Sequence, residues 1–395
     1  MNSRLLNKEV QEFIKENSDK EINKIVLAGS PFPNISIKEL AEQIVARKQI
    51  EDKLPTFFKT DGILFPPKLN LEQSSSEITG NFKSQLIRGK NMVDLTGGFG
   101  IDSYFFTKSF EQVTYCEQNE DLCTIARHNF NVLNRKNISC QCGDGLDWLS
   151  HSSEKFDWIY LDPARRSAEQ KKVFLLEDCT PDLLQNFDLL FSHTNQILLK
   201  LSPMIDISSV VLKIPFVKQI HLIAIKNEVK ELLIVIEKGF KKEIHISTTN
   251  FSKVTETFQA LYPDINDVSL TYPKKFLYEP NSAILKSGLF NKLSKNLSLS
   301  KLHANTHLYT SDKLINFPGR SFEIVAQTKV NKKEIKKQIP ELKANVAIRN
   351  FPSTVSELRK KFKLKEGGTD YLFFTTNLND EHIVLYCTKI NLDQY

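Results

Sequence analysis

The sequence predicts an α/β protein with a mostly parallel β-sheet at its centre, a helical segment before the sheet and a smaller α+β region after it. Between residue 91 and about residue 240, short apolar runs alternate with amphipathic segments long enough to be helices. This alternation is typical of parallel strands joined by right-handed helical crossovers. Residues 1 to about 88 instead carry apolar residues three and four positions apart, as in LLNKEVQEFIKE, which predicts helices.

The length of 395 residues exceeds that of one ordinary domain. We expect a helical part at 1–88, the parallel sheet at 89–240, and two further parts at 241–322 and 323–395. The last part has the order strand, helix, strand, helix, strand, strand, which predicts a small two-layer α/β domain. Together these parts give the chain an ordinary multidomain plan.

Three local patterns make narrower predictions. The run HLIAIKNEVKELLIVIE predicts an antiparallel hairpin at one edge of the sheet. Ser74 and Glu77 fit a capping box that starts a helix running to about Arg88. Residues 281–297 predict one helix.

The composition is that of a water-soluble protein with enough apolar residues for a core, at 41% hydrophobic and 25% charged. The net charge of +6 permits a polyanionic partner without requiring one. The N-terminus lacks the apolar core of a signal peptide, and no window approaches the roughly twenty apolar residues of a membrane span. We therefore expect a cytoplasmic protein with no membrane partner.

The six cysteines are scattered, and none forms the paired CxxC clusters of a zinc site. We expect no metal centre. Reduced, buried, structural thiols are the expectation for a protein of the cytoplasm.

The most specific motif is VDLTGGFGID, at residues 93–102. A strand ends at Asp94, and Gly97, Gly98 and Gly100 follow before a helix begins at about Ile101. Glycines allow the backbone to turn tightly and to approach a ligand that a Cβ would exclude. Such a turn alone is only a weak indication of a nucleotide-like ligand.

Three more acids strengthen this indication, because each follows a predicted strand. Glu117 ends VTYCE, Asp144 follows ISCQCG, and Asp162 ends FDWIYLD. Ligands of open α/β sheets bind at the carboxyl ends of the strands, so we expect the four acids to share one site.

This block resembles the class I, Rossmann-like S-adenosylmethionine-dependent methyltransferases, whose first motif reads acid, apolar, small, any, Gly, any, Gly. The resemblance implies S-adenosyl-L-methionine as cofactor, with Glu117 on the ribose hydroxyls and Asp144 on the adenine amine. A dinucleotide dehydrogenase is the main competitor, but its GxGxxG spacing is not met. A polar turn before the first strand adds two further contacts, although a plain helix cap explains that turn equally well. The predicted cofactor-binding residues are Gln73, Ser75, Asp94, Thr96, Gly97, Gly98, Phe99, Gly100, Glu117, Asp144 and Asp162.

The likeness extends along most of the chain. The segments LDPARR, FLYEPNSAILKSG, FPGRSF and NFPSTVSELRKKFKLKEGGTDYLFFTT are similar to those of a bacterial methyltransferase family. That family has a helical N-terminal arm, a ferredoxin-like region and a THUMP-like C-terminal domain. The resemblance thus implies a ferredoxin-like region at 241–322 and a THUMP-like domain at 323–395, but it implies no particular substrate.

The stretch DWIYLDPARRS indicates the acceptor. Methyltransferases of exocyclic base amines carry Asp/Asn-Pro-Pro-aromatic here, and this chain keeps only the first half, with Asp162 and Pro163. We expect Asp162 to align the amine rather than to deprotonate it, because a carboxylate is a weak base. Arg165 and Arg166 suit a phosphate or a base edge, or else ion pairs with nearby acids. The predicted catalytic residues are Asp162, Pro163 and Arg165.

The 5-methyluridine RNA methyltransferases also resemble this stretch, since they use DPPR or DPAR. Their chemistry needs a cysteine nucleophile after the next strand, where this chain reads Leu201-Ser202-Pro203. Cys179 lies upstream and is a poor candidate, so covalent pyrimidine methylation is disfavoured. Lys200 and Ser202 could instead line the acceptor side.

Residues 329–366 hold twelve Lys or Arg against four Asp or Glu. This concentration fits a phosphate-tracking surface, on which Phe351 and Phe362 could stack with an unpaired base, or else two solvated helix faces with both rings in the core. Because THUMP domains generally bind RNA, the resemblance favours tRNA or rRNA and transfer to a base nitrogen. A protein or small-molecule acceptor, and a catalytically silent RNA-binding protein, remain as alternatives.

Overall fold

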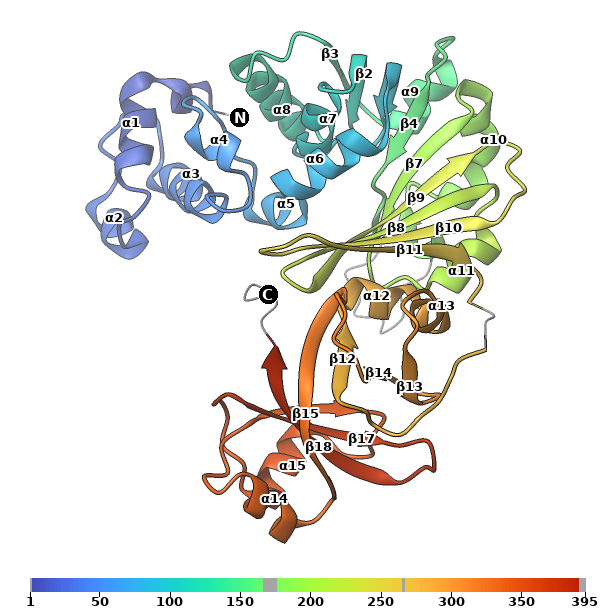
Figure 1. Cartoon of the computed structure of the whole chain (residues 1–395). Coiled ribbons are helices and arrows are strands. Elements are labelled where there is room, and N and C mark those ends of the chain that lie inside the picture. The colour runs from blue at the N-terminus through green and yellow to red at the C-terminus, as the bar shows by residue number, and fades with distance from the viewer. Residues whose placement is uncertain (1, 166–175, 265–266, 391–395) are drawn as a thin grey trace. The chain divides into compact units, whose positions relative to one another are not determined.

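The computed structural model describes residues 2–165, 176–264 and 267–390 (Figure 1). The chain divides into two compact units. The first unit comprises Met1–Val217 and Leu233–Lys241, and the second comprises Lys218–Leu232 and Lys242–Tyr395. None of the described helices is long and apolar enough to cross a membrane.

The N-terminal part of the first unit is helical, as predicted. Its apolar residues form one core with the helices that follow β1 and β2: the rings of Phe57 and Phe99 lie 5.7 Å apart, and the Leu64 amide donates to Asn129 Oδ1 at 2.9 Å. The arm is therefore part of the sheet-containing unit. Its elements are η1 (Ser3–Leu6), α1 (Lys8–Glu16), α2 (Ile22–Ala28), α3 (Ile37–Gln49), α4 (Pro55–Lys59), α5 (Lys68–Gln73) and α6 (Glu77–Leu86).

The predicted capping box at Ser74 and Glu77 is wrong. The helix α6 is capped by Ser76, whose hydroxyl accepts from the Thr79 amide at 3.2 Å, and Thr79 returns the bond as the N3 residue. Glu77 instead accepts from the amide and hydroxyl of Thr56 in α4. The Glu77 side chain, which the local pattern predicts to cap the helix, thus makes a tertiary contact with α4 instead.

The central sheet has the strand order β11-β10-β8-β9-β7-β4-β1-β2-β3, and the neighbouring strands among β7, β4, β1, β2 and β3 pair in parallel. The parallel α/β prediction is confirmed. The strands are β1 (Gly89–Asp94), β2 (Phe110–Glu117), β3 (Ile138–Cys142), β4 (Trp158–Leu161), β7 (Gln196–Leu201), β8 (Val217–Ile225), β9 (Glu228–Glu237), β10 (Ile244–Phe251) and β11 (Glu256–Tyr262). Between them run α7 (Ile101–Phe106), α8 (Glu120–Val132), α9 (Gly145–His151), α10 (Leu183–His193) and α11 (Ile207–Lys213).

The predicted hairpin exists, but its predicted place at the sheet edge is wrong. The strands β8 and β9 are neighbours joined at Lys226 and Asn227, which both have positive φ. Beyond them β10 pairs in parallel with β8, and β11 pairs antiparallel with β10. The residues after 241 therefore extend the sheet before the next region begins.

The second sheet has the order β13-β14-β12-β15-β18-β17-β16. Its last part shows the predicted order of strands and helices, whereas the predicted helix 281–297 is broken in two at Gly288, which has a φ of +73°. The strands are β12 (Phe276–Pro280), β13 (Ser300–His303), β14 (Thr306–Ser311), β15 (Gly319–Lys329), β16 (Asn345–Arg349), β17 (Asp370–Thr376) and β18 (His382–Ile390). The helices are α12 (Ser282–Ser287), α13 (Phe290–Asn296), α14 (Lys332–Gln338) and α15 (Val355–Phe362).

This sheet buries apolar residues on both faces. One face packs against α14 and α15, and its core includes Phe362, which stacks on Phe374 with the ring centroids 5.8 Å apart. Phe351 packs against the same core. The suggestion that these two rings stack on a base is therefore wrong, because both serve to join α15 and its loop to the sheet.

Candidate active site

The loop after β1 is built around a buried acid. Asp94 is 1% exposed and accepts hydrogen bonds from the Thr96 amide at 3.0 Å and the Ser103 hydroxyl at 2.5 Å. Burial raises the pKa of Asp94 to about 7 against these two bonds, and the charges of Asp102 and Asp162 act in the same direction as burial. Asp94 thus ties the loop to α7 instead of facing solvent.

The glycines of this loop have different roles. A Cβ on Gly97 would lie 2.1 Å from the Tyr115 ring, so this position needs glycine for packing against β2. Gly98 has a φ of +56°, and apart from Gly98 and its two chain neighbours the nearest described atom to the position of its Cβ is the Thr96 carbonyl oxygen, at 4.0 Å. The loop is therefore supported beneath Gly97 and has open space over Gly98, where a ligand could lie against the backbone.

Glu117 and Asp144 lie at the next two strand ends, as predicted. Glu117 accepts from the amides of Gly98 and Asn119, each at 2.8 Å, so it links the glycine loop to the start of α8. Asp144 caps α9 with Oδ1, which accepts from the amides of Leu146 and Asp147. A carboxylate can accept about four hydrogen bonds, so both acids keep capacity for a ligand.

A buried charge cluster connects α6, α7, β4 and β7. Lys83 is fully buried, and its Nζ lies 3.1 Å from Asp102 Oδ1 and 3.0 Å from Ser75 Oγ. Asp102 Oδ2 accepts from Ser75 at 2.8 Å and from Tyr160 Oη at 2.7 Å. Burial acts to raise the pKa of Asp102, but Lys83, Lys200 and these hydrogen bonds together hold it below its ordinary value.

Asp162 is the end of this cluster nearest solvent. Its Oδ2 lies 2.5 Å from Lys200 Nζ, and Lys200 lies 4.0 Å from Asp102. The Asp162 amide donates to Thr96 Oγ1 at 2.6 Å, which fixes the end of β4 to the glycine loop. Burial raises the pKa of Asp162, and Lys200 offsets only part of that shift. Among the described residues Oδ1 of Asp162 has no hydrogen-bond partner. This oxygen can therefore accept a hydrogen bond from the amine that is to be methylated.

The structure places the other predicted residues as follows. The Phe99 side chain is buried against the helical arm, so only its backbone can line a ligand. Gln73 is exposed at the end of α5. The backbone of Arg165 pairs with Cys179 in the short β5 (Ala164–Arg165) and β6 (Cys179–Thr180) sheet, while Arg166 lies outside the described residues. Pro163 follows Asp162 and is half-buried, and Gly100, with a φ of +84°, leads into α7.

Sequence reasoning missed Lys83, Asp102 and Tyr160 and did not foresee what Lys200 binds. A signal was present for Lys83, because it shares the buried face of α6 with Thr79, Gly80 and Ser84. A lysine on a helix face whose other residues are small or uncharged indicates that the lysine is buried against a partner of opposite charge. Asp102 stands in IDSYFF, whose six residues are all buried in α7.

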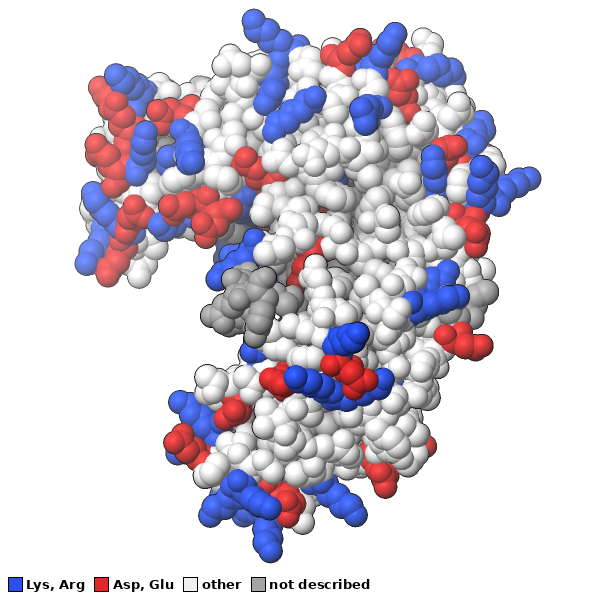
Figure 2. All heavy atoms as spheres, in the orientation of Figure 1, with Lys and Arg blue, Asp and Glu red and all other residues white. Residues whose placement is uncertain are grey.

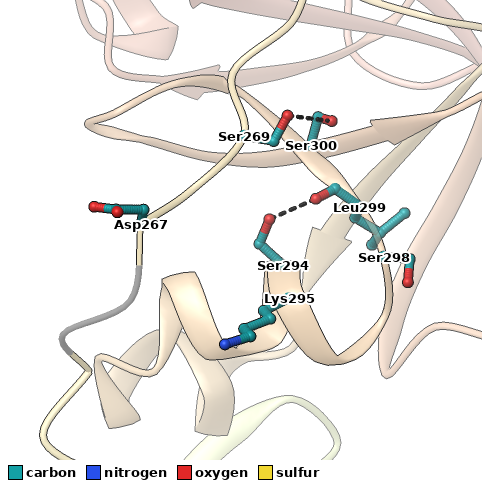
Figure 3. A pocket seen from close by; sticks show the side chains of 7 residues that line it. All are labelled: Asp267, Ser269, Ser294, Lys295, Ser298, Leu299 and Ser300. Carbon is teal, nitrogen blue, oxygen red and sulfur yellow. Dashed lines mark hydrogen bonds between the residues drawn. The ribbon is translucent and has the colours of Figure 1, made fainter.

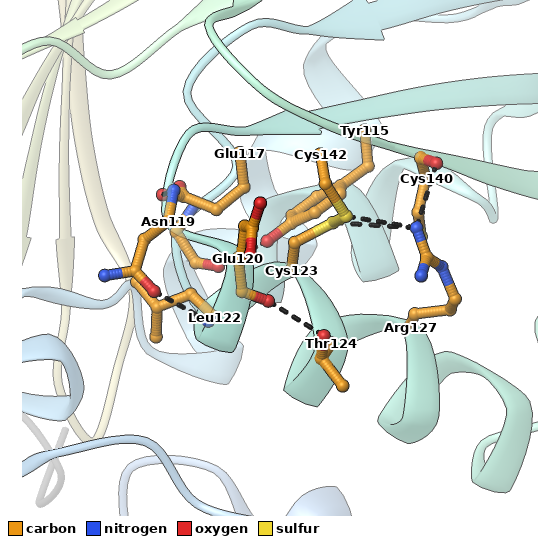
Figure 4. Close-up of a disulfide and its surroundings, with 11 residues drawn as sticks. Tyr115, Glu117, Asn119, Glu120, Leu122, Cys123, Thr124, Arg127, Cys140 and Cys142 are labelled. Carbon is orange, nitrogen blue, oxygen red and sulfur yellow. Dashed lines mark hydrogen bonds between the residues drawn. A yellow bond between two sulfur atoms is a disulfide. The ribbon is translucent and has the colours of Figure 1, made fainter. Parts of the chain in front are cut away.

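The expectation of reduced thiols is wrong for two cysteines. Cys123 in α8 and Cys142 at the end of β3 form a disulfide across a sequence separation of 19, because packing of the helix beside the strand brings their Cα atoms to 5.7 Å (Figure 4). Arg127 donates to Cys142 Sγ at 3.1 Å. The bridge joins the segments that carry Glu117 and Asp144. Cys116, Cys140 and Cys387 keep free thiols, and the described residues contain no cluster of three or more potential metal ligands.

A separate cavity of about 660 Å³ lies in the second unit (Figure 3). Serine side chains dominate its lining, but Ser294 already donates to the Leu299 carbonyl at 2.5 Å and Ser300 to Ser269 Oγ at 3.2 Å. None of the predicted site residues lines it. The edge of the central sheet therefore remains the candidate active site.

Comparison with known proteins identifies the C-terminal domains and two relatives. Residues 276–318 match the model of a ferredoxin-like domain, and residues 319–389 match a THUMP domain-like model. A stretch of 173 residues is 30% identical to an uncharacterized RNA methyltransferase of Mycoplasma mobile, covering 40% of this chain and 48% of that protein. The chain thus spans about half the length of this curated relative.

A second relative matches over its full length. The crystal structure of a presumed methyltransferase from Porphyromonas gingivalis W83 superposes with a TM-score of 0.87 at 31% identity, covering 99% of this chain and 100% of that one. The glycine loop, the acids at successive strand ends and this full-length match agree with one another. The chain belongs to the same family as the Porphyromonas gingivalis protein and is a class I S-adenosylmethionine-dependent methyltransferase with a THUMP-like C-terminal domain.

Proposed function

We propose that this methyltransferase uses S-adenosyl-L-methionine to methylate a base nitrogen of structured RNA, tRNA or rRNA, by direct transfer. The observation that carries the proposal is Asp162, which is held at the sheet edge by Lys200 through one oxygen and leaves the other oxygen available. The Pro163 carbonyl next to it offers a second acceptor for an amine.

The residues around the glycine loop fit the proposed cofactor. The open space over Gly98, the spare acceptor capacity of Glu117 and the exposed carboxylate of Asp144 suit the methionine, ribose and adenine parts in turn. When bound, the cofactor supplies an electrophilic methyl group. The protein contributes position: Thr96 fixes Asp162 beside the loop, and Asp162 Oδ1 orients an amine for in-line attack.

Two observations support RNA as the acceptor. The Mycoplasma mobile relative is named as an RNA methyltransferase, and residues 319–389 match a THUMP domain-like model. Figure 2 shows Lys and Arg side chains gathered at the lower end of the view, over α14, with a few acidic groups among them. An RNA substrate also fits a protein of the cytoplasm, where we place this chain.

The test is transfer of tritium from labelled cofactor into total RNA and total protein from the same cells. The proposal expects label in RNA alone, followed by a single methylated nucleoside on mass spectrometry. Label in protein would favour the alternative acceptor and would overturn the RNA assignment. Calorimetry without measurable cofactor binding would favour the catalytically silent RNA-binding protein.

The cofactor placement has its own test in Gly98→Val. A valine at a φ of +56° adds bulk to the space over the loop, so cofactor affinity should be lost. Gly97→Ala is the comparison. Its added Cβ would clash with the Tyr115 ring, so this variant should lower the melting temperature before it affects cofactor binding. Unchanged calorimetric affinity of Gly98→Val would refute the loop as the cofactor site.

A further inference from the structure

A second charge cluster lies in the second unit and has no part in the active site described above. Glu279 in β12 is 3% exposed, and its two carboxylate oxygens pair separately with Arg320 in β15 and Arg349 in β16. We call these three residues the sheet mouth. Two of the segments that carry the family resemblance, FLYEP and FPGR, contribute Glu279 and Arg320, and Arg349 directly precedes NFPSTV.

The pairing requires the second sheet to curl, because β12 and β16 are not neighbours in the strand order. The two ends of the sheet do approach each other: Asn350 Nδ2 lies 3.1 Å from His303 Nδ1, and the Thr306 hydroxyl donates to the Thr376 carbonyl at 3.5 Å. The strands thus enclose an apolar interior that includes Leu277, Phe322 and Ala347.

Strand periodicity places the sheet mouth at one end of that interior. Each of its residues lies two positions from an interior residue on the same strand: Glu279 from Leu277, Arg320 from Phe322, and Arg349 from Ala347. Side chains two apart share a face of a strand. Gly319 makes the approach possible, because a Cβ there would lie 2.2 Å from the Glu279 carbonyl oxygen.

The sheet mouth has more positive charge than its carboxylate can balance. One carboxylate pairs with two guanidinium groups, and the side chains of Arg320 and Arg349 remain 38% and 34% exposed. Among the described residues, Arg320 Nη1 and Arg349 Nε have no hydrogen-bond partner. The structure therefore holds two partly exposed guanidinium groups against one carboxylate, and each has a donor left for a ligand.

Such a pair suits a tetrahedral oxyanion. Guanidinium forks bind phosphate through paired charge-assisted hydrogen bonds, and a carboxylate behind them fixes their orientation before the ligand arrives. The Arg320 guanidinium also lies 5.5 Å from the Phe322 ring centroid, which restricts it further. One arginine would be enough to balance the negative charge of Glu279, so the second guanidinium group leaves one positive charge over.

We propose that the sheet mouth binds a phosphodiester group of the RNA substrate, with Arg320 and Arg349 as the contacting residues. This inference rests on the proposed RNA function. It adds a defined contact point to what would otherwise be a diffuse basic surface.

The experiment measures binding of total bacterial tRNA to the full-length protein at several salt concentrations. Arg320→Gln and Arg349→Gln should each weaken binding about tenfold and reduce the slope of log K against log salt by about one. Lys253→Gln removes the same charge from an exposed turn of this unit and should change neither quantity. Melting curves identify any variant that fails to fold. In that case Arg320→Lys takes its place, because lysine keeps the charge but loses the two-pronged guanidinium group. This variant should weaken tRNA binding a few fold.

The outcomes separate this inference from the proposed function. The wild type could methylate RNA while both glutamine variants bind tRNA with unchanged affinity and salt slope. The sheet mouth would then be a purely structural ion-pair cluster, and the inference would be overturned while the proposed function stands. If the wild type neither binds nor methylates RNA, the proposed function itself fails. At constant ionic strength, inorganic phosphate should compete with tRNA for the sheet mouth, so it should weaken binding by the wild type more than binding by either glutamine variant. Equal weakening of all three proteins would again overturn the inference.

Discussion

The two units each contain a buried charge cluster, and the clusters differ in balance and in exposure. The cluster beside the glycine loop joins Lys83 and Lys200 to Asp102 and Asp162, so two cations meet two carboxylates. The sheet mouth joins two arginines to Glu279 alone. The balanced cluster positions its members and leaves one carboxylate oxygen, Asp162 Oδ1, for a ligand, whereas the cluster with excess positive charge can bind an anion.

This difference assigns the balanced cluster a positioning role. Lys83 is fully buried, and Ser75 connects it with the turn that precedes α6. Because a buried ion pair gains little net stability, its value lies in holding a defined geometry. Here that geometry ends at Asp162, the single carboxylate of the cluster whose side chain is as much as one-third exposed.

The largest expected effect comes from removing that exposed end. Asp162→Ala should lower the rate of methyl transfer by at least about 10³-fold, because the acceptor amine loses its aligning group. Cofactor affinity should stay within a few fold, since Glu117, Asp144 and the glycine loop are untouched. Transfer of tritium from labelled cofactor and calorimetry measure the two quantities. Glu154→Ala, an exposed acid of the same unit, is the control, and retained turnover by Asp162→Ala would refute the assignment.

The next effect compares the stability of the two clusters. Lys83→Met leaves the buried Asp102 with Lys200, at 4.0 Å, as its one remaining cation among the described residues, so the free energy of unfolding should fall by about 3–5 kcal/mol. Arg349→Gln removes an arginine whose side chain is one-third exposed and leaves the buried Glu279 paired with Arg320, so it should cost only about 1 kcal/mol. Urea unfolding of both variants measures the difference. Equal losses would show that the clusters do not differ in the way described.

The sequence predicted the elements of the active site better than their connections. Asp94, Glu117, Asp144 and Asp162 lie at successive strand ends because strand alternation and the chemistry of the sheet edge are local patterns. The partners of these acids are not local. The face of α6 that carries Lys83 indicates that this lysine is buried, but only packing of α6 on α7 directs it to Asp102.

The same limit explains the corrections. Glu77 has the spacing of a capping residue but meets Thr56, twenty-one positions away. Phe351 and Phe362 fit either a nucleic-acid surface or a core until the neighbouring β17 ring, Phe374, is placed. The bridge between Cys123 and Cys142 depends on how α8 lies beside β3. Each of these three errors concerns a side chain whose partner is distant in the sequence.

Asp94 is a third acid close to the balanced cluster, and among the described residues it has no cation of its own. Its pKa is raised by burial from 3.8 to about 7, so the folded protein keeps a proton that the unfolded chain releases. The stability gained from this proton is complete below about pH 4 and is lost as the pH rises to about 7. Asp102, whose pKa is lowered, acts in the opposite sense at the acid end.

Asp94→Asn should therefore remove the decrease in the free energy of unfolding that Asp94 causes as the pH rises. Asparagine can still accept from the Thr96 amide and can donate to the Ser103 hydroxyl. Relative to the wild type, the variant should gain about 3 kcal/mol in the free energy of unfolding between about pH 4 and pH 7. Urea midpoints across this range measure it, with Glu154→Gln as the control for loss of an exposed carboxylate. Parallel curves for Asp94→Asn and the wild type would mean that Asp94 is ionised throughout, and that the glycine loop is held by a charge instead of by a neutral acid.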